Sequence, residues 1–381
     1  MKNINICFFT GSRSEFGISK ILIEKFKKTK FNFSLVASGS HLMRDFGETI
    51  DEIKDLKIQN LDKIRLKNYK KLLHHNIHAN SFAKNCVYLK KKKFDYALII
   101  GDRIESLSFA LSCFFFKIKI IHFHGGELTQ GSLDNYYRNI ISSISNYHFV
   151  SNFIYKKRLI NLGNEPKKIF NIGSLSLDKI SNYKFVTKKE FQLKNKILFK
   201  NKIAMVSFHP LQEKRETYHQ INLLTQVCKK FNDVSFIFTS PSMDPNYKII
   251  TNKIKRECKN NENFFYFDSL GHYNYVSVVK FCDLIIGNSS SGIIEAPFLK
   301  TLSINIGDRQ LGREKSSSVI NILIPDKNNL YKKMEKLLYR KQKIKFQNKY
   351  FKKNASQHVM KIFKNIILKD KSEKIFYDIK N

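Results

Sequence analysis

The sequence predicts an α/β protein with two doubly wound domains that face a cleft. Its 381 residues exceed what one hydrophobic core usually serves, which favours two domains of ordinary size. Short β-branched or aromatic runs alternate with longer amphipathic stretches, and this alternation is typical of βα units around a parallel sheet. A polar, lysine-rich stretch at residues 178–201 interrupts the alternation before it resumes. We therefore expect an N-terminal domain at residues 1–180 and a C-terminal domain at residues 181–381.

The apolar runs predict two sets of five strands. In the first half they lie at residues 4–9, 33–38, 96–100, 118–122 and 147–150, with helices between them such as 18–28 and 105–116. In the second half they lie at residues 203–208, 235–239, 264–267, 284–286 and 302–306. A last helix at residues 354–368 follows, and the sequence leaves open whether it packs back on the N-terminal domain. Ligands of doubly wound sheets lie beyond the carboxyl ends of the strands, so the loops there form the candidate site.

The net charge of +36 suggests nucleic acid or an anionic membrane as a partner. The lysines are spread along the chain, however, and accompany a surplus of Ile, Asn and Phe, which is typical of an AT-rich genome. We interpret the charge as a solvated surface that attracts anionic substrates, and we expect no nucleic-acid partner.

The apolar segments predict neither a secretion signal nor a membrane span. Residues 4–9 are too short for a signal sequence, and the longest apolar stretch, residues 107–123, is broken by Lys117 and Lys119. The six cysteines form no C-x-x-C pair, and several lie in apolar runs as buried free thiols do. These features favour a reducing cytoplasm.

The strand-end loop at residues 287–292, Gly-Asn-Ser-Ser-Ser-Gly, suits a pyrophosphate. Its glycines free the backbone, its serines supply hydroxyls, and a helix at residues 293–299 supplies the partial positive charge of its N-terminus. Glu295, one turn into this helix, can accept hydrogen bonds from two ribose hydroxyls. Helix capping and a surface acid are the alternative interpretations. The residues expected to bind the nucleotide here are Ser289, Ser290, Ser291, Gly292 and Glu295.

Two more loops bring arginines to strand ends. Arg309 and Arg313 follow the strand at residues 302–306, and their guanidinium groups match the oxygens of a diphosphate. Arg13 follows the first strand beside Gly11 at a helix N-terminus, which is a weak anion site by itself. Solvated surface arginines are the alternative in both places.

The first domain carries acids at the ends of two strands. Asp102 and Glu127 follow strands of one parallel sheet, so both can face the same pocket, as acid/base catalysis requires. Taken singly, Asp102 could cap a helix and Glu127 could be an ordinary loop acid.

Three histidines follow or end strands. His209 lies at a strand end of the second half, where it could stabilise charge or move a proton. His122 and His124 alternate with Phe123, which predicts that both point to one face of a strand. No Cys or Asp cluster accompanies them, so we expect no metal site.

These loops together resemble those of the hydrolysing UDP-N-acetylglucosamine 2-epimerases, the group that feeds sialic and related nonulosonic acid pathways. The resemblance covers nearly the whole chain. Its motifs are TGSRSEFG at 10–17, SGSHLMRDFG at 38–47, GDRIE at 101–105, HFHGGELTQGSLD at 122–134, SFHP at 207–210, GNSSSGIIEAP at 287–297 and INIGDRQLGR at 304–313.

The resemblance implies two Rossmann-like domains in the glycosyltransferase B arrangement, usually in a homodimer or homotetramer, without metal or NAD. It implies a two-stage reaction on a nucleotide sugar: anti elimination of UDP gives a 2-acetamidoglucal, and hydration then gives free N-acetylmannosamine. UDP-N-acetylglucosamine is the default substrate, and a UDP- or GDP-2,4-diacetamido-6-deoxy sugar is the alternative.

The resemblance also implies roles for the residues at positions that match the family motifs. Catalytic roles fall to Asp102, Glu127, His209 and an acid after Glu127, for which Asp134 is the candidate. Arg138, in the same stretch, is expected to bind the substrate. Nucleotide contacts fall to Arg13, Ser289, Ser290, Glu295 and Arg309.

One stretch departs from the family pattern. Where relatives carry a second acid and a His, this chain has Asn135 and Asn139, and an amide cannot accept a proton as a carboxylate does. The roles of Asp102, Glu127 and Asp134 therefore stay open. A glycosyltransferase of the same fold and an inactive nucleotide-sugar-binding protein are the alternative functions.

Overall fold

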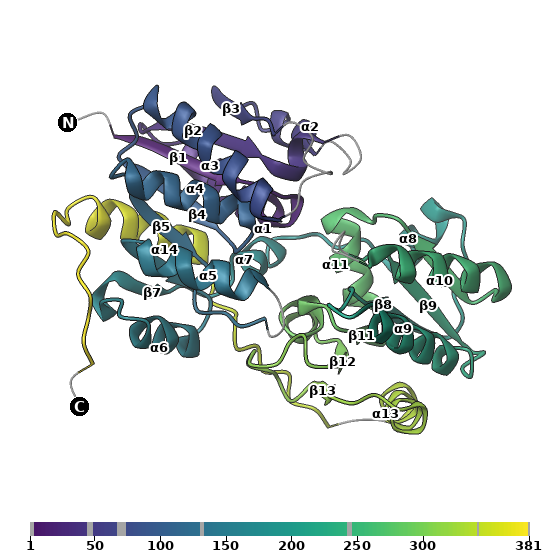
Figure 1. Cartoon of the computed structure of the whole chain (residues 1–381). Coiled ribbons are helices and arrows are strands. Elements are labelled where there is room, and N and C mark those ends of the chain that lie inside the picture. Colours follow the sequence, from purple (N-terminus) through teal and green to yellow (C-terminus); the bar gives the residue numbers. More distant parts are fainter. Residues whose placement is uncertain are drawn as a thin grey trace. The chain divides into compact units, whose positions relative to one another are not determined.

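A computed structural model describes residues 4–43, 49–66, 74–129, 133–241, 246–340 and 343–379 of the chain. The chain divides into two compact units (Figure 1). The first comprises residues 1–127, 133–179 and 350–381, and the second comprises residues 128–132 and 180–349. The end of the chain therefore returns to the first unit.

The first unit is built on a seven-stranded parallel sheet with the order β3-β2-β1-β4-β5-β6-β7. Its strands are β1 (Asn5–Thr10), β2 (Asn32–Ser38), β3 (Asn60–Ile64), β4 (Tyr96–Ile100), β5 (Lys119–Phe123), β6 (Tyr147–Val150) and β7 (Ile169–Asn171). Its helices are α1 (Arg13–Lys27), α2 (Ile50–Lys54), α3 (His74–Lys90), α4 (Ile104–Phe115), α5 (Leu133–Ile144), α6 (Phe153–Asn161), α7 (Leu175–Ile180) and α14 (Ala355–Ile362).

Both faces of this sheet are buried, because apolar residues alternate between them along each strand. Ile6 and Phe8 of β1 point into a core that α1 and α14 complete, whereas Cys7 and Phe9 point into a second core under α3, α4 and α5. Phe363, just past α14, packs edge-on against the ring of Phe26 with centroids 5.3 Å apart. The last helix of the chain is thus part of the first unit's core.

The second unit repeats the architecture with six parallel strands in the order β10-β9-β8-β11-β12-β13. Its strands are β8 (Lys202–Ser207), β9 (Val234–Thr239), β10 (Phe264–Phe267), β11 (Leu284–Gly287), β12 (Leu302–Ile306) and β13 (Val319–Ile322). Its helices are α8 (Lys188–Asn195), α9 (Lys214–Cys228), α10 (Tyr247–Asn260), α11 (Gly271–Phe281), α12 (Glu295–Leu299) and α13 (Lys327–Tyr339). One continuous core lies between this sheet and α9, α10 and α13.

Several helices begin where a side chain caps free backbone N–H groups. Ser12 accepts from the N–H of Glu15 at the start of α1, and Thr187 forms a reciprocal capping box with Glu190 at the start of α8. Both caps fall at polar residues directly before an amphipathic run, so the sequence determines these helix starts locally.

The fold class predicted from the sequence is confirmed: both units are doubly wound α/β sheets. Three strands, β3, β7 and β13, were not predicted, and each is an edge or short strand. In each sheet the order in which successive strands are added reverses beside the first strand. This switch point lies between β1 and β4 in the first sheet and between β8 and β11 in the second. Such switch points are where these folds bind ligands. Within the described residues, none of the helices is long and apolar enough to cross a membrane.

Candidate active site

The switch point of the first sheet is lined by a buried carboxyl group on α1. The N–H of Gly11 donates to Oε2 of Glu15 at 2.8 Å, and Ser106 Oγ donates to Oε1 at 2.7 Å. Burial raises the pKa of Glu15 to about 7, with the nearby Glu105 adding to the rise and both donors opposing it. A Cβ placed on Gly101 would lie 3.1 Å from Glu15 Oε1, so the loop after β4 approaches this carboxyl closely.

A buried arginine joins the two acids predicted at the strand ends. Arg138 of α5 forms an ion pair with Asp102, which follows β4, and donates from Nη1 to the backbone oxygen of Glu127 at 2.7 Å. The same Nη1 lies 3.4 Å from Oδ1 of Asn135, one turn earlier on the helix. The guanidinium group of Arg138 thus contacts both Asp102 and the backbone of Glu127, whereas the sequence predicted Arg138 as a substrate-binding residue.

The turn that presents Glu127 fits only small residues. Gly126 has φ +75°, and a Cβ there would lie 2.5 Å from the backbone oxygen of Tyr155. A Cβ on Gly125 would lie 2.7 Å from Ser142 Oγ. The turn therefore packs tightly against α5 and α6, and this packing fixes the position of the Glu127 backbone.

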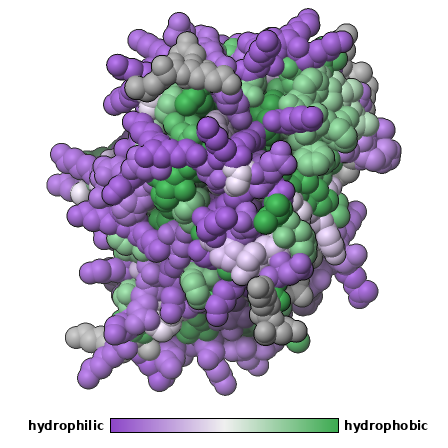
Figure 2. All heavy atoms as spheres, turned by 90° about the vertical axis from the view of Figure 1, so that its left-hand side faces the viewer, coloured by the Kyte–Doolittle hydropathy of each residue, from purple (hydrophilic) through white to green (hydrophobic). Residues whose placement is uncertain are grey.

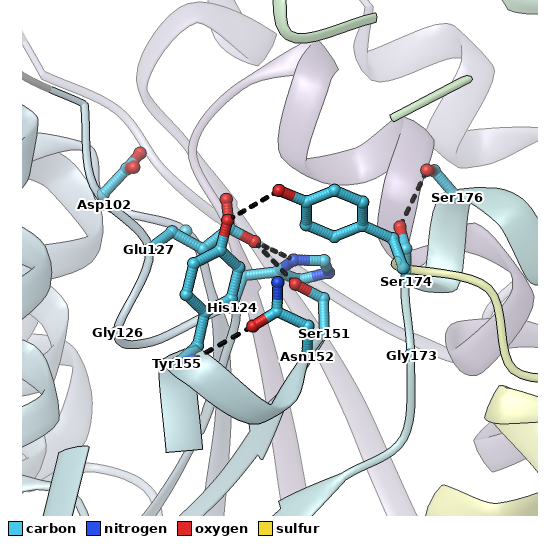
Figure 3. A network of polar contacts seen from close by, with 12 residues as sticks. Asp102, His124, Gly126, Glu127, Ser151, Asn152, Tyr155, Gly173, Ser174 and Ser176 are labelled. Carbon is cyan, nitrogen blue, oxygen red and sulfur yellow. Dashed lines mark hydrogen bonds and ion pairs between the residues drawn. The ribbon is translucent and has the colours of Figure 1, made fainter. Parts of the chain in front are cut away.

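The carboxyl group of Glu127 is buried and held by two polar side chains (Figure 3). His124 Nδ1 lies 2.8 Å from Glu127 Oε1, and Ser151 Oγ donates to the same oxygen at 3.1 Å. Close by, the hydroxyl of Tyr155 lies 2.9 Å from that of Tyr350, which belongs to the C-terminal segment of the first unit. Sequence reasoning missed Ser151, because only the pairing of β5 with β6 brings it here.

His122 and His124 do not share one environment, contrary to the expectation from their alternation. The strand ends at Phe123, and His124 adopts φ +64° beyond it. His122 is fully buried, with Nδ1 2.9 Å from Ser142 Oγ and Nε2 2.9 Å from the backbone oxygen of Gly101. Burial lowers the pKa of His122 to about 4, so this imidazole is neutral and structural near neutral pH.

Two other predicted residues of the first unit, Arg13 and Asp134, lie at helix N-termini. Arg13 is exposed and forms an ion pair with Glu52 at 2.9 Å. Asp134 lies half-buried in the first turn of α5. Parts of two quoted motifs, residues 44–47 and 130–132, lie outside the described residues.

In the second unit, Asn288 ties together the two strand ends at the switch point. Its Oδ1 accepts from the N–H of His209 at 2.6 Å, and its Nδ2 donates to the backbone oxygen of His209 at 2.9 Å. Its own backbone oxygen accepts from Gln310 Nε2 at 3.0 Å and from Arg309 Nη1 at 3.4 Å. The loops carrying the predicted His209, serines and Arg309 therefore converge on one buried amide that the sequence did not single out.

The serine loop folds tightly against the sheet. Gly287 has φ +142°, and a Cβ there would lie 1.9 Å from the backbone oxygen of Ser207. A Cβ on Gly292 would lie 2.7 Å from Ser303 Oγ. Ser291 Oγ lies 3.2 Å from Ser289 Oγ and 2.5 Å from the hydroxyl of Tyr275 on α11. The hydroxyl groups of this loop are thus organised by a tyrosine from a separate helix.

The helix after the serine loop begins later than predicted. A short 3-10 turn spans Ser290–Gly292, and α12 starts at Glu295, so Glu295 is the first residue of the helix instead of lying one turn inside it. Pro297 explains the shift, because proline has no N–H to donate and is tolerated only in the first turn. Arg313 is half-buried in the loop after β12.

The described part of the chain contains no group of three or more His, Cys, Asp or Glu residues that could hold a metal ion. Each unit carries its own set of strand-end loops at its switch point. The first offers carboxylates, a histidine and a buried arginine, and the second offers hydroxyls, backbone N–H groups and arginines suited to an anionic ligand.

Comparison with known proteins places these loops in context. A family model described as UDP-N-acetylglucosamine 2-epimerase matches residues 24–364. The GDP/UDP-N,N'-diacetylbacillosamine 2-epimerase (hydrolyzing) of Campylobacter jejuni is 36% identical over 339 residues, covering 88% of this chain and 88% of that protein. The polysialic acid biosynthesis protein P7 of Escherichia coli is 34% identical over 389 residues, covering 98% of this chain and 97% of that protein.

Solved structures share the fold. The crystal structure of UDP-GlcNAc 2-epimerase from Neisseria meningitidis bound to UDP-GlcNAc matches with a TM-score of 0.78 at 18% identity. The match covers 95% of this chain and 100% of that chain, so the two-unit α/β architecture is common to both.

Proposed function

Because this chain is an enzyme of the UDP-N-acetylglucosamine 2-epimerase family, we propose that it is a hydrolysing 2-epimerase acting on a nucleotide-activated 2-acetamido sugar. The observation that carries this proposal is the cluster of Asp102, Arg138 and Glu127 at the carboxyl ends of β4 and β5. Elimination needs a group that accepts the C2 proton, and a cluster of positioned carboxylates supplies one.

The proposed reaction has two stages. A carboxylate accepts the proton at C2, the bond between C1 and the diphosphate oxygen breaks, and a C1=C2 double bond forms as the nucleoside diphosphate leaves. Water then adds its oxygen to C1 while a proton returns to the opposite face of C2. The candidates for these proton transfers are Asp102, Glu127 and Asp134 in the first unit and His209 in the second.

The second unit is proposed to bind the nucleotide. The serine loop presents the N–H groups and hydroxyls of Ser289, Ser290 and Ser291, which suit phosphate oxygens. Arg309 and Arg313 add positive charge, and Glu295 at the start of α12 is placed to accept ribose hydroxyls. No step in this scheme requires a metal or a redox cofactor.

Two substrates compete. The relative at 36% identity carries the name of an enzyme for GDP- or UDP-diacetylbacillosamine, which favours a 2,4-diacetamido-6-deoxy sugar. The relative at 34% identity carries the name of a polysialic acid biosynthesis protein, which favours UDP-N-acetylglucosamine as the source of an N-acetylmannosamine precursor. We propose the diacetamido sugar as the first to test, with the product feeding nonulosonic acid synthesis.

The test is product identification by NMR with UDP-N-acetylglucosamine, UDP-diacetylbacillosamine and GDP-diacetylbacillosamine, carried out in heavy water. A hydrolysing 2-epimerase releases a free sugar of inverted configuration that carries deuterium at C2. A glycosyltransferase would leave C2 untouched, and an inactive binding protein would show a melting shift without turnover. Absence of nucleotide release from all three sugars would refute the proposal.

We also propose that the chain forms a homodimer through the outer face of α3 and α4. Val87, Phe114 and Phe115 are 63%, 52% and 67% exposed there, and the ring of Phe115 packs edge-on against Phe82 at 5.8 Å. On the face shown in Figure 2, hydrophilic residues surround several hydrophobic areas. Two copies with a net charge of +36 repel each other, so an associating face needs apolar side chains whose burial offsets this repulsion.

Analytical ultracentrifugation tests this surface. F115E is expected to shift the protein towards monomer, because it places a charge in the apolar face. I324E, at a residue that is 86% exposed in the second unit, is the matched control and should leave the sedimentation coefficient unchanged. A wild-type protein that is monomeric at micromolar concentration would contradict the proposed dimer.

A further inference from the structure

One oxygen of the Glu127 carboxyl group lies within hydrogen-bond distance of two side chains. Ser151, which follows β6, donates its hydroxyl to Oε1 at 3.1 Å, and His124 Nδ1 lies 2.8 Å from that oxygen. Glu127 is 6% exposed, and the side chain of His124 is 15% exposed, so water competes little with either contact. The two donors come from different strand ends of one sheet (Figure 3).

This geometry determines where the protons are. An oxygen that accepts from Ser151 and lies within hydrogen-bond distance of His124 Nδ1 cannot easily carry a proton of its own. With the shared proton on Nδ1, Oε1 accepts from both neighbours. His124 is then either the Nδ1–H tautomer or the imidazolium, and both states favour the ionised form of Glu127.

His124 has an uncommon backbone conformation that allows its side chain to reach Glu127. The residue has φ +64°, a conformation that is uncommon for side chains with a Cβ. Its N–H donates to the backbone oxygen of Phe149 at 2.9 Å, and the next two glycines are pressed against α5 and α6. A left-handed histidine costs conformational energy, and the side-chain position it creates here is the one that reaches Glu127.

The charged groups around the pair act in the same direction. Arg138 of α5 donates to the backbone oxygen of Glu127 at 2.7 Å, and Arg158 of α6 donates to that of Gly126 at 3.2 Å. His122 is neutral, and Asp102 is already paired with Arg138. The turn thus carries more positive than negative neighbours, which stabilises a carboxylate.

We propose that His124 is a positioning residue that donates from Nδ1 to Glu127 and thereby holds Glu127 as an oriented carboxylate, ready to accept a proton. The proposal rests on the function given above, and it narrows the choice among the acids. Asp102 is engaged by a direct guanidinium contact, whereas Glu127 is held by a histidine and a hydroxyl. Glu127 is therefore the acid that we expect to accept the C2 proton.

Three variants separate this role from a purely structural one. H124G keeps the positive φ without a side chain, and H124N keeps the positive φ together with an N–H donor, because glycine and asparagine tolerate this conformation. We expect kcat to fall roughly 100-fold in H124G with little change in KM, and to recover to within about tenfold of wild type in H124N. S151A removes the other donor and is expected to have a smaller effect. Wild-type kcat in H124G would overturn the proposal.

A measurement without substrate keeps the proposal independent of the reaction. In protein labelled with ¹⁵N histidine, and with His124 assigned by H124N, the Nδ1 signal is expected at a proton-bearing shift. In E127A the acceptor is gone, and the proton is expected to move to Nε2. A bare Nδ1 in the wild type would overturn the positioning role even if the enzyme is active. If the wild type releases no nucleotide from any sugar, the proposed function is refuted. The ¹⁵N measurement then still shows whether His124 Nδ1 donates to Glu127.

Discussion

Glu15 is a single buried acid whose charge state links stability to pH. Burial raises its pKa from 4.5 to about 7, so the folded state binds its proton more tightly than the unfolded state does. The stabilisation from this group is complete below pH 4.5 and is lost as the pH rises through 7. Glutamine mimics the protonated acid and carries no such dependence.

We therefore predict that the free energy of unfolding of the wild type, measured relative to E15Q, falls by about 3 kcal/mol between pH 4.5 and pH 8. Urea unfolding of both proteins across this range measures the difference. A difference that stays constant with pH would mean that Glu15 has the same proton affinity in both states. Neighbouring Glu105 adds to the predicted shift and Arg103 opposes it.

Asn135 is a second residue whose chemistry can be tested directly. Its Oδ1 lies 3.4 Å from Arg138 Nη1, within the cluster that contains Asp102. N135D places a carboxylate beside this guanidinium. We predict that turnover changes by less than about tenfold, because Glu127 is the proposed base and a missing base would cost at least about 100-fold. N135L, of similar size without polarity, is the control, and a rise of about 100-fold or more in N135D would show that the wild type lacks a working base.

The sequence predicts which residues lie at strand ends, but not which side chains meet there. The doubly wound pattern places Asp102, Glu127 and His209 after strands, and each is found there. The contacts that organise them come from Ser151, Asn288 and Tyr275, and these depend on strand pairing and helix packing across many residues. Their roles as site residues stay predictions.

At the scale of elements, the sequence likewise does not predict strands whose formation depends on pairing at the edge of a sheet. β3 reads Asn-Leu-Asp-Lys-Ile and has little β propensity, and β7 has only three residues. Both form because a neighbouring strand offers free backbone groups, which is a tertiary effect. The central strands were predictable because burial on both faces makes them continuously apolar.

The connection between β11 and the serine loop gives an element-scale prediction. An added Cβ on Gly287 would meet the backbone oxygen of Ser207 at 1.9 Å, which would force β11 away from β8. Gly271 also has positive φ, but nothing lies within 4 Å of an added Cβ there. We predict that G287A lowers the free energy of unfolding by about 3–5 kcal/mol, whereas G271A costs only about 1–2 kcal/mol.

Calorimetric titration with UDP adds a functional readout to this pair of variants. G287A is expected to lose UDP binding, because the N–H groups of the serine loop move with the strand. G271A should bind UDP as the wild type does. UDP binding that survives in G287A would show that the loop does not depend on the close approach of the two strands.

At the scale of the whole molecule, each unit has its own hydrophobic core, and the chain crosses between the units more than once. The core of the first unit includes Phe363, contributed by a segment that follows the whole second unit in sequence. The sequence pattern could suggest a helix at residues 354–368, but amphipathicity alone does not say which core it completes. The hydrophobic core of the first unit therefore cannot form fully without the C-terminal segment that carries Phe363.

A pair of core substitutions tests this division of stability. Phe363 is fully buried in the first unit, and Leu330 of α13 is fully buried in the second. We predict that F363A destabilises the first unit by about 3–5 kcal/mol and that L330A destabilises the second by about 2–5 kcal/mol. Hydrogen exchange measured by mass spectrometry reports on peptides of each unit separately. Faster exchange in β1 and β4 with F363A, and in β8 and β9 with L330A, is the expected result, because each cavity weakens only the core that surrounds it. If both variants accelerate exchange in all four strands equally, the chain unfolds as one cooperative unit and the returning segment has no special role in the first.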